Sequence, residues 1–178
     1  MIILYSKIQI KLLRGIISVL LLPLSFLPFH LQADDSLKGD IKNGQSIAAE
    51  HCDRCHGAGG VSSDIDTPSL ASQSAAYTLK QINDYKNKTR EDKNMYKRVR
   101  KLNGQQIIDL SLWYEVQKLP ETDLSAKVNL KPPQLVITGD SARSIPPCDI
   151  CHGKDGKTTA EGAPALAGQQ ADYLISTM

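Results

Sequence analysis

The sequence predicts an all-α protein made of two similar units in tandem, the second of them incomplete at its C-terminus. Apolar side chains recur at helical spacing in the 178 residues, and no convincing alternating strand pattern is present. The same landmark residues also return at a constant offset of 96 residues without a gap. That offset is too long for a solenoid repeat, so it indicates a duplicated domain.

The repeat is defined by residues of the same type at matching positions. The matched pairs are Cys52/Cys148, Cys55/Cys151, His56/His152, Gly57/Gly153, Gly60/Gly156, Pro68/Pro164, Leu70/Leu166, Gln73/Gln169 and Tyr77/Tyr173. We therefore expect a first unit at residues 34–119, a linker at residues 120–137 and a second unit at residues 138–178. The prolines of the linker favour a partly extended chain.

The first unit is expected to begin with two helices. Asp40 or Asn43 is a suitable N-cap for a helix that runs into Cys52, and Ser74 is a suitable N-cap for a helix over 75–85. Between them, glycines and a Thr-Pro-Ser turn interrupt helical structure. The side chains expected to face inward are Ile41, Ile47 and Ala48 on the first helix and Leu79 and Ile82 on the second.

A last helix is expected to complete the first unit. Asn103, with Gln106 three residues later, predicts a capping box at the start of a helix that ends near Lys118. Its buried face is expected to consist of Ile107, Leu110, Ser111 and Tyr114, which follow helical spacing.

Residues 1–33 have the order of a signal peptide. Three basic residues, Lys7, Lys11 and Arg14, precede an apolar run over 15–29, and the small residue Ala33 stands at the expected cleavage site. A membrane anchor is the alternative, but the run is shorter than the ~20 apolar residues that span a bilayer. We therefore expect cleavage and export to the periplasm.

Removal of residues 1–33 changes the composition of the chain. The remaining 145 residues carry a net charge of −1, which argues against a nucleic-acid-binding protein. They contain one tryptophan, five tyrosines and no phenylalanine. Because aromatic side chains supply much of an ordinary core, this composition favours a bound macrocycle as part of the interior.

The four cysteines form two CxxC pairs, each followed directly by a histidine. The motifs are Cys52-Asp53-Arg54-Cys55-His56 and Cys148-Asp149-Ile150-Cys151-His152. This pattern is the attachment motif of c-type haem. Residues three apart share one face of a helix, so both thiols can reach the two vinyl groups of one porphyrin. The sequence therefore predicts two covalently bound haems.

Three other uses of these cysteines are conceivable. An exported protein with an even number of cysteines often forms disulfides. Four thiolates can hold a tetrahedral zinc ion, but 92 residues separate Cys55 from Cys148, far more than in ordinary zinc ribbons. Zinc also gives no reason for the two histidines. A thioredoxin-like redox pair needs a preceding strand, whereas the sequence here is helical.

The order of these motifs resembles class I cytochrome c. The resemblance rests on CxxCHG, then Pro-x-Leu-Ala-x-Gln, a tyrosine, a loop rich in Lys and Arg, Met95, and a last helix that ends in Trp113 and Tyr114. Two such units after a signal peptide resemble the exported dihaem cytochromes of the cytochrome c4 group. The resemblance implies a helical fold around covalent haem that carries electrons and catalyses no turnover of its own.

The resemblance also implies the residues that hold each haem. The thiols of Cys52, Cys55, Cys148 and Cys151 attach the two haems, and His56 and His152 are axial iron ligands. The other ring nitrogen of His56 should donate its N–H in a hydrogen bond to a backbone carbonyl. In the family that carbonyl belongs to the proline that matches Pro68. Met95 is expected in a loop before the last helix, as the second ligand of the first iron.

The second unit is expected to lack a methionine ligand. The repeat offset places the counterpart of Met95 at position 191, beyond the last residue. Met178 matches Ile82 instead, which favours a buried helix residue, or merely the final residue, over an iron ligand. The counterpart of the last helix is missing too. A truncated version of a longer dihaem protein is the simplest explanation, and an open second iron is the alternative.

A basic segment indicates redox partners. Residues 86–101, from Lys86 to Lys101, hold eight basic and two acidic residues. One interpretation is a solvated helix face. The other is a docking surface beside Met95, near an exposed haem edge, that orients an acidic partner. Charge reversal at Lys97, Arg98 and Lys101 would distinguish the docking surface from a solvated face.

Two function classes are therefore open. The family resemblance implies a periplasmic electron carrier between a quinol-oxidising complex and a terminal oxidase, with at most a loose association with the membrane surface. The alternative is the electron-entry subunit of a periplasmic dehydrogenase, or a peroxidase-like enzyme. A peroxidase needs an open iron position and a distal acid or base, and no residue is marked as distal. We therefore expect a carrier and no enzyme.

Overall fold

The regular structure of the chain is helical. The computed structural model describes residues 38–120, 132–157, 160 and 162–178. In these ranges no strand forms, and the one strand-like feature is an isolated antiparallel bridge between Asp140 and Ile145. The predicted all-α fold class is therefore confirmed.

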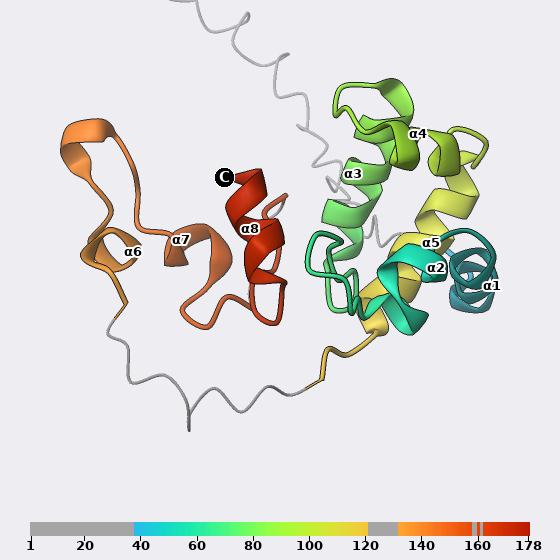
Figure 1. The fold of residues 1–178 in the computed structure, drawn as a ribbon, viewed down its shortest axis with the longest axis horizontal. Coiled ribbons are helices and arrows are strands. Elements are labelled where there is room, and N and C mark those ends of the chain that lie inside the picture. Colours follow the sequence, from blue (N-terminus) through green and yellow to red (C-terminus); the bar gives the residue numbers. More distant parts are fainter. Residues whose placement is uncertain (1–37, 121–131, 158–159, 161) are drawn as a thin grey trace, which may run out of the picture. The chain divides into compact units, whose positions relative to one another are not determined.

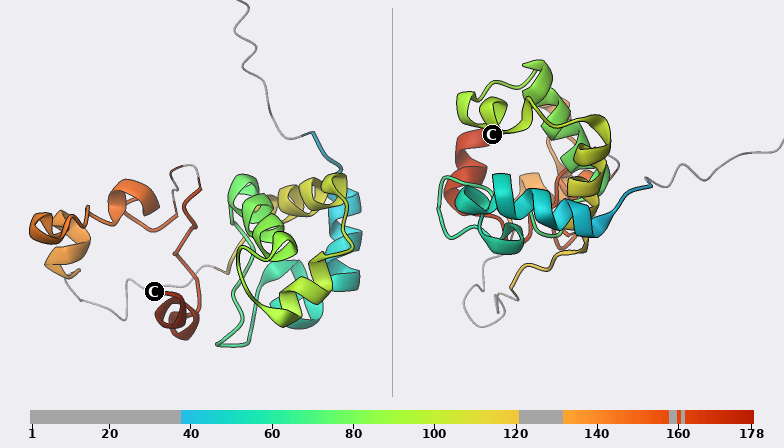
Figure 2. Two further views of the ribbon diagram at one scale, coloured as in Figure 1. Left: turned by 90° about the horizontal axis from the view of Figure 1, so that it is seen from above. Right: turned by 90° about the vertical axis from the view of Figure 1, so that its right-hand side faces the viewer.

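The first unit is a set of helices that pack around α5 (Figure 1). Its elements are α1 (Ile41–His51), α2 (Asp53–His56), a 3₁₀ turn (Ala58–Gly60), α3 (Ala75–Asn87), α4 (Lys93–Val99) and α5 (Gly104–Val116). Both α1 and α3 pack against α5, and α3 also packs against α4. Figure 2 shows the same helices from two further sides.

The helix start signals in the sequence act as expected. Asp40, rather than Asn43, caps α1 by accepting hydrogen bonds from two backbone N–H groups. Ser74 caps α3. Asn103 and Gln106 form the predicted reciprocal capping box of α5. Each cap satisfies backbone donors that a helix N-terminus otherwise leaves unpaired.

The core of the first unit lies where α1, α3 and α5 meet. Its buried members are Ile47, Ala48, Ile82, Val99, Leu102, Ile107, Leu110 and Tyr114. All four residues predicted for the buried face of α5 are buried. Ile41, the first residue of α1, is exposed, and Leu79 is half-buried, so these two positions contribute less than expected.

A buried carboxylate, Asp109, joins α1 to α5 and was not predicted. It is 2% exposed and accepts hydrogen bonds from Asp40 N at 2.8 Å, Asn43 Nδ2 at 2.7 Å and Gln105 Nε2 at 2.8 Å. The two helices approach closely here, because a Cβ at Gly44 would lie 2.1 Å from the Asp109 carbonyl oxygen. The start of α1 is thus fixed on the middle of α5.

The remaining described residues contain shorter elements. These are α6 (Gln134–Thr138), a 3₁₀ turn (Ser141–Arg143), α7 (Asp149–His152) and α8 (Ala171–Thr177). Helix α6 lies almost wholly in the linker, residues 120–137, which was expected to be partly extended. Pro133 is its N-cap, a place where proline does not interrupt a helix. The expected signal peptide, 1–33, lies outside the described residues. No helix in the described ranges is both long and apolar enough to span a bilayer.

Candidate haem sites

The first CxxCH motif forms one helical turn directly after α1. The backbone N–H groups of Cys55 and His56 both donate to the carbonyl oxygen of Cys52, each at 3.0 Å. Cys52 is half-buried, Cys55 is exposed and His56 is only 7% exposed. The two thiols and the imidazole are thus close along one turn, as attachment to one porphyrin requires.

His56 is oriented by a backbone hydrogen bond. Its Nδ1 donates to the carbonyl oxygen of Pro68 at 2.9 Å, which leaves Nε2 with its lone pair. Burial lowers the pKa of His56, and the hydrogen bond to Pro68 opposes this only in part. The lowered pKa of His56 favours the neutral imidazole, which is the form that ligates iron through Nε2.

The environment of Cys52 favours a neutral sulfur. Burial raises the pKa of the Cys52 thiol to about 11, while Tyr114 and the positive charge of Arg98 lower it by less. A thioether formed with a vinyl group carries no charge and fits the same place.

A glycine turn returns the chain to the motif. Gly60 has a φ of 77°, and its carbonyl oxygen accepts hydrogen bonds from Leu70 N and Ala71 N at 2.7 and 3.1 Å. A Cβ at Gly60 would lie 2.8 Å from the Tyr114 ring, so a larger residue is excluded. The turn holds the Pro68 loop against His56.

The second CxxCH motif repeats this geometry in α7. The backbone N–H of His152 donates to Cys148 O at 3.0 Å, and His152 Nδ1 donates to the carbonyl oxygen of Pro164 at 2.8 Å. Gly156 accepts two backbone hydrogen bonds, as its counterpart Gly60 does. His152 is half-buried and so less covered than His56. The sequence repeat is therefore also a repeat of local structure.

The two methionines differ from expectation in their surroundings. Met95 was expected in a loop, but it lies in α4, where its N–H donates to the N-cap Asp92 at 2.8 Å. It is half-buried against the core cluster that contains Val99 and Leu102. Met178 is 97% exposed, so its interpretation as a buried helix residue is wrong. The role of Met95 as an iron ligand stays a prediction.

The described residues fit haem better than the alternatives. No group of three or more His, Cys, Asp and Glu side chains among them is arranged to hold a metal ion, and none of the four cysteines is in a disulfide. Trp113 Nε1 is buried without a hydrogen-bond partner in the described part of the chain. A buried polar atom that stays unpaired lowers the folding stability by about 1–3 kcal/mol, unless a bound group forms a hydrogen bond with it.

Comparison with known proteins identifies the family. The family model for Cytochrome c matches residues 41–113. Cytochrome c4 of Pseudomonas aeruginosa is 34% identical over 148 residues, which cover 79% of this chain and 70% of that protein. This chain belongs to the cytochrome c4 family.

Two further relatives of this cytochrome c4 family member bear on its role. The thiosulfate dehydrogenase electron acceptor of Stutzerimonas stutzeri is 29% identical over 155 residues, covering 83% of this chain and 70% of that protein. The crystal structure of reduced recombinant cytochrome c4 from Pseudomonas stutzeri matches with a TM-score of 0.66 and 28% identity, over 79% of this chain and 78% of that one.

Membership of the cytochrome c4 family establishes the cofactor and the class of activity. The cofactor is covalently bound c-type haem, and cytochrome c4 is a dihaem protein. The chain is an electron-transfer protein and not an enzyme. The predictions of family, cofactor and non-enzymatic activity are confirmed. When bound, haem supplies reversible one-electron exchange at iron.

The repeated glutamines connect the two units of this cytochrome c4 relative. All the residues involved belong to one compact region, Ser36–Met178. Gln73 Nε2 donates to Ala165 O at 2.7 Å, and Gln73 Oε1 accepts from Ala165 N at 3.0 Å. Gln169 pairs in the same way with Ser69, at 2.9 and 2.8 Å. The sequence repeat marked these glutamines but gave no indication of their contacts.

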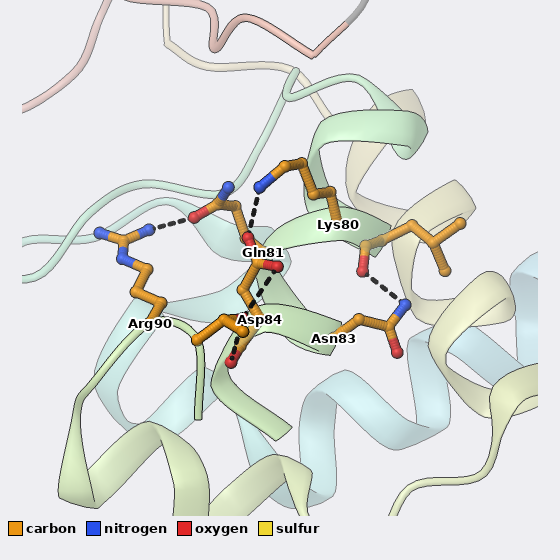
Figure 3. Close-up of polar contacts among 7 residues, drawn as sticks. Lys80, Gln81, Asn83, Asp84 and Arg90 are labelled. Carbon is orange, nitrogen blue, oxygen red and sulfur yellow. Dashed lines mark hydrogen bonds and ion pairs between the residues drawn. The ribbon is translucent and has the colours of Figure 1, made fainter. Parts of the chain in front are cut away.

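Arg90 makes a further contact between the units. Its guanidinium lies over the Tyr85 ring, 4.8 Å from the centroid, and donates to the Tyr173 hydroxyl at 3.1 Å. Figure 3 shows Arg90 directed back to Gln81 on α3, beside the ion pair of Lys80 with Asp84. Arg90 is thus engaged inside the molecule.

Proposed function

We propose that this protein is a periplasmic dihaem carrier that passes electrons along a respiratory chain toward a terminal oxidase. Export through a signal peptide at residues 1–33 would place it in the periplasm. The residues that would hold the haems are Cys52, Cys55, His56 and Met95 in the first unit and Cys148, Cys151 and His152 in the second. The observation that carries the proposal is the pair of CxxCH turns, each with its histidine Nδ1 bound to a proline carbonyl.

The partner would dock on the exposed part of the basic segment. We define the docking surface as the exposed side chains of Lys93, Lys97, Arg98, Arg100 and Lys101. The other basic residues of the segment are engaged elsewhere. Lys86 donates to the carbonyl oxygen of Leu102, Lys88 lies 4.7 Å from the centroid of the Tyr96 ring, and Arg90 contacts Tyr173.

The docking surface lies beside the first haem attachment. Arg98 is close enough to Cys52 for its charge to lower the pKa of that thiol, against the larger effect of burial. Lys97 and Arg98 are on the same helix as Met95. A partner held by these charges would therefore stand near the first haem, which would shorten the path for electron transfer, and the contact would be small and salt-dependent.

A charge-reversal experiment tests docking. The triple variant Lys97→Glu, Arg98→Glu and Lys101→Glu should slow electron transfer to an acidic redox partner at low ionic strength. The control reverses three exposed charges elsewhere, Lys42, Lys118 and Lys154, and so changes the net charge equally. Stopped-flow rates across ionic strengths are the measurement. Equal rates for both triple variants would assign the basic segment to a solvated face.

A second candidate partner is a periplasmic dehydrogenase. The relative named thiosulfate dehydrogenase electron acceptor supports this alternative. Two assays separate the candidates. A carrier of the respiratory chain restores oxygen uptake when it is added between a quinol-oxidising complex and a terminal oxidase. A dehydrogenase acceptor is instead reduced rapidly by purified thiosulfate dehydrogenase and leaves oxygen uptake unchanged.

A further inference from the structure

The glutamine pairs contact the same peptide groups that orient the two histidines. The peptide group between Pro68 and Ser69 contains the carbonyl that accepts from His56 Nδ1 and the N–H that donates to Gln169 Oε1. The two hydrogen bonds measure 2.9 and 2.8 Å and lie at opposite ends of one planar amide. His56 is thereby linked to a glutamine of the second unit through a single peptide group.

The second site has the same connection in the reverse direction. His152 Nδ1 donates to Pro164 O at 2.8 Å, and the N–H of that peptide group, Ala165 N, donates to Gln73 Oε1 at 3.0 Å. Gln73 is only 6% exposed, and so is Ala165. Each unit therefore holds the peptide group that orients the histidine of the other unit.

Such a chain of hydrogen bonds transmits polarisation. Amide resonance couples the N–H and C=O of a peptide group, and consecutive hydrogen bonds strengthen one another in a low-dielectric interior. An acceptor on the N–H side makes the carbonyl a stronger acceptor for the histidine Nδ1–H. A stronger hydrogen bond at Nδ1 increases the basicity of Nε2, which stabilises ferric iron and lowers the reduction potential.

We propose that Gln169 tunes the reduction potential of the first haem and that Gln73 tunes that of the second, each across the contact between the units. This inference rests on the proposed axial roles of His56 and His152. Both glutamines are positioning residues, because each acts through a peptide group and a histidine. Separation or rotation of the units would break these hydrogen bonds and raise both potentials.

A neighbouring residue supplies the matched control. Gln170 Nε2 donates to Ser62 O at 2.8 Å, so it also connects the two units by a side-chain amide. Its partner, Ser62, is not part of a peptide group that contacts either histidine. Loss of Gln170 should therefore weaken the contact between the units without shifting the reduction potential of one haem more than that of the other.

Redox titration of the holoprotein tests the proposal, with each haem followed by its own methyl proton resonances. Gln169→Leu should raise the potential of the first haem and leave that of the second nearly unchanged. Gln73→Leu should do the converse. In the reduced protein, the Nδ1 proton resonance of the histidine whose peptide group lost its glutamine should move upfield. Gln170→Leu should produce neither selective shift.

A carboxylate at the same position separates tuning from simple cohesion. Gln169→Glu keeps an acceptor for Ser69 N and makes it stronger, so it should lower the potential of the first haem, opposite in sign to Gln169→Leu. Gln170→Glu places the same negative charge one residue away. It controls for the general effect of that charge on the reduction potentials. Gln169→Glu also replaces Gln169→Leu as the test variant if the leucine variant fails to fold.

Two results would overturn the inference. Equal shifts at both haems in every variant, or the same sign for Gln169→Leu and Gln169→Glu, would leave the glutamines with a purely structural role. Failure of the proposed function is seen separately, because a protein without covalent haem or without histidine ligation is recognised from its absorption spectrum before any titration.

Discussion

Replacing Asp109 with alanine should destabilise the first unit substantially. The carboxylate accepts three hydrogen bonds that join α1 to α5, from Asp40 N, Asn43 Nδ2 and Gln105 Nε2. At about 1 kcal/mol for each bond, Asp109→Ala should cost about 3 kcal/mol of unfolding free energy. That loss should lower the melting temperature by roughly 12 °C or more. Asp109→Asn retains an acceptor oxygen and should cost less.

The effect of Asp109 should also depend on pH. Burial opposes ionisation of this side chain, but its hydrogen bonds from Asn43, Gln105 and Asp40 outweigh burial and lower the pKa of Asp109. A lowered pKa in the folded state stabilises the protein above the unfolded value of about 3.9. That stabilisation is lost as the pH falls through the lower, folded value. The difference between wild type and Asp109→Asn should therefore shrink in acid.

Guanidinium unfolding of the holoprotein, followed by the circular dichroism of its helices at several pH values, measures both effects. Asp66→Ala is the control, since Asp66 is an exposed carboxylate outside the contact between α1 and α5. A loss below about 0.5 kcal/mol for Asp109→Ala, the range of ordinary surface substitutions, would show that these hydrogen bonds do not fix α1 on α5.

Two further predictions concern the first iron and the approach of α1 to α5. Met95→Ala should remove the weak red absorption band of Met–Fe(III) ligation and lower the reduction potential of the first haem. Met178→Ala, at an exposed position, should leave the band unchanged. A band that survives in Met95→Ala would show that another group is the ligand. Gly44→Ala should cost about 1–3 kcal/mol because its Cβ would meet Asp109 O at 2.1 Å. Gly104→Ala, at a position with open space around it, should stabilise by about 0.4–1 kcal/mol; thermal melts in which both variants shift alike would contradict the close contact.

The sequence predicted those features of the fold that depend on neighbouring residues. The caps Ser74 and Asn103 could be predicted because a capping residue bonds to backbone groups two or three positions away. The buried face of α5 is visible because helical periodicity is a local pattern. The two CxxCH turns are visible because all their groups lie within five residues.

The features that sequence reasoning missed depend on residues far apart. Asp109 is a polar residue whose partners Asp40 and Asn43 lie at the start of another helix, so no local pattern marks it as buried. Gln73 and Gln169 were marked by the repeat, but their partners lie 92 and 100 residues away. Helix α4 was taken for a loop because its seven residues are mostly polar. In each case tertiary contacts, and not propensity, decide the structure.

Both CxxCH turns should carry covalent haem. Intact-mass spectrometry of the purified protein under denaturing conditions tests this directly, since a thioether-linked haem stays attached when the fold is lost. We predict a mass that exceeds the polypeptide by two haem groups, with peptide fragments that place one on Cys52 and Cys55 and the other on Cys148 and Cys151. The mass of the bare polypeptide, with or without zinc in the native protein, would show that neither motif carries covalent haem.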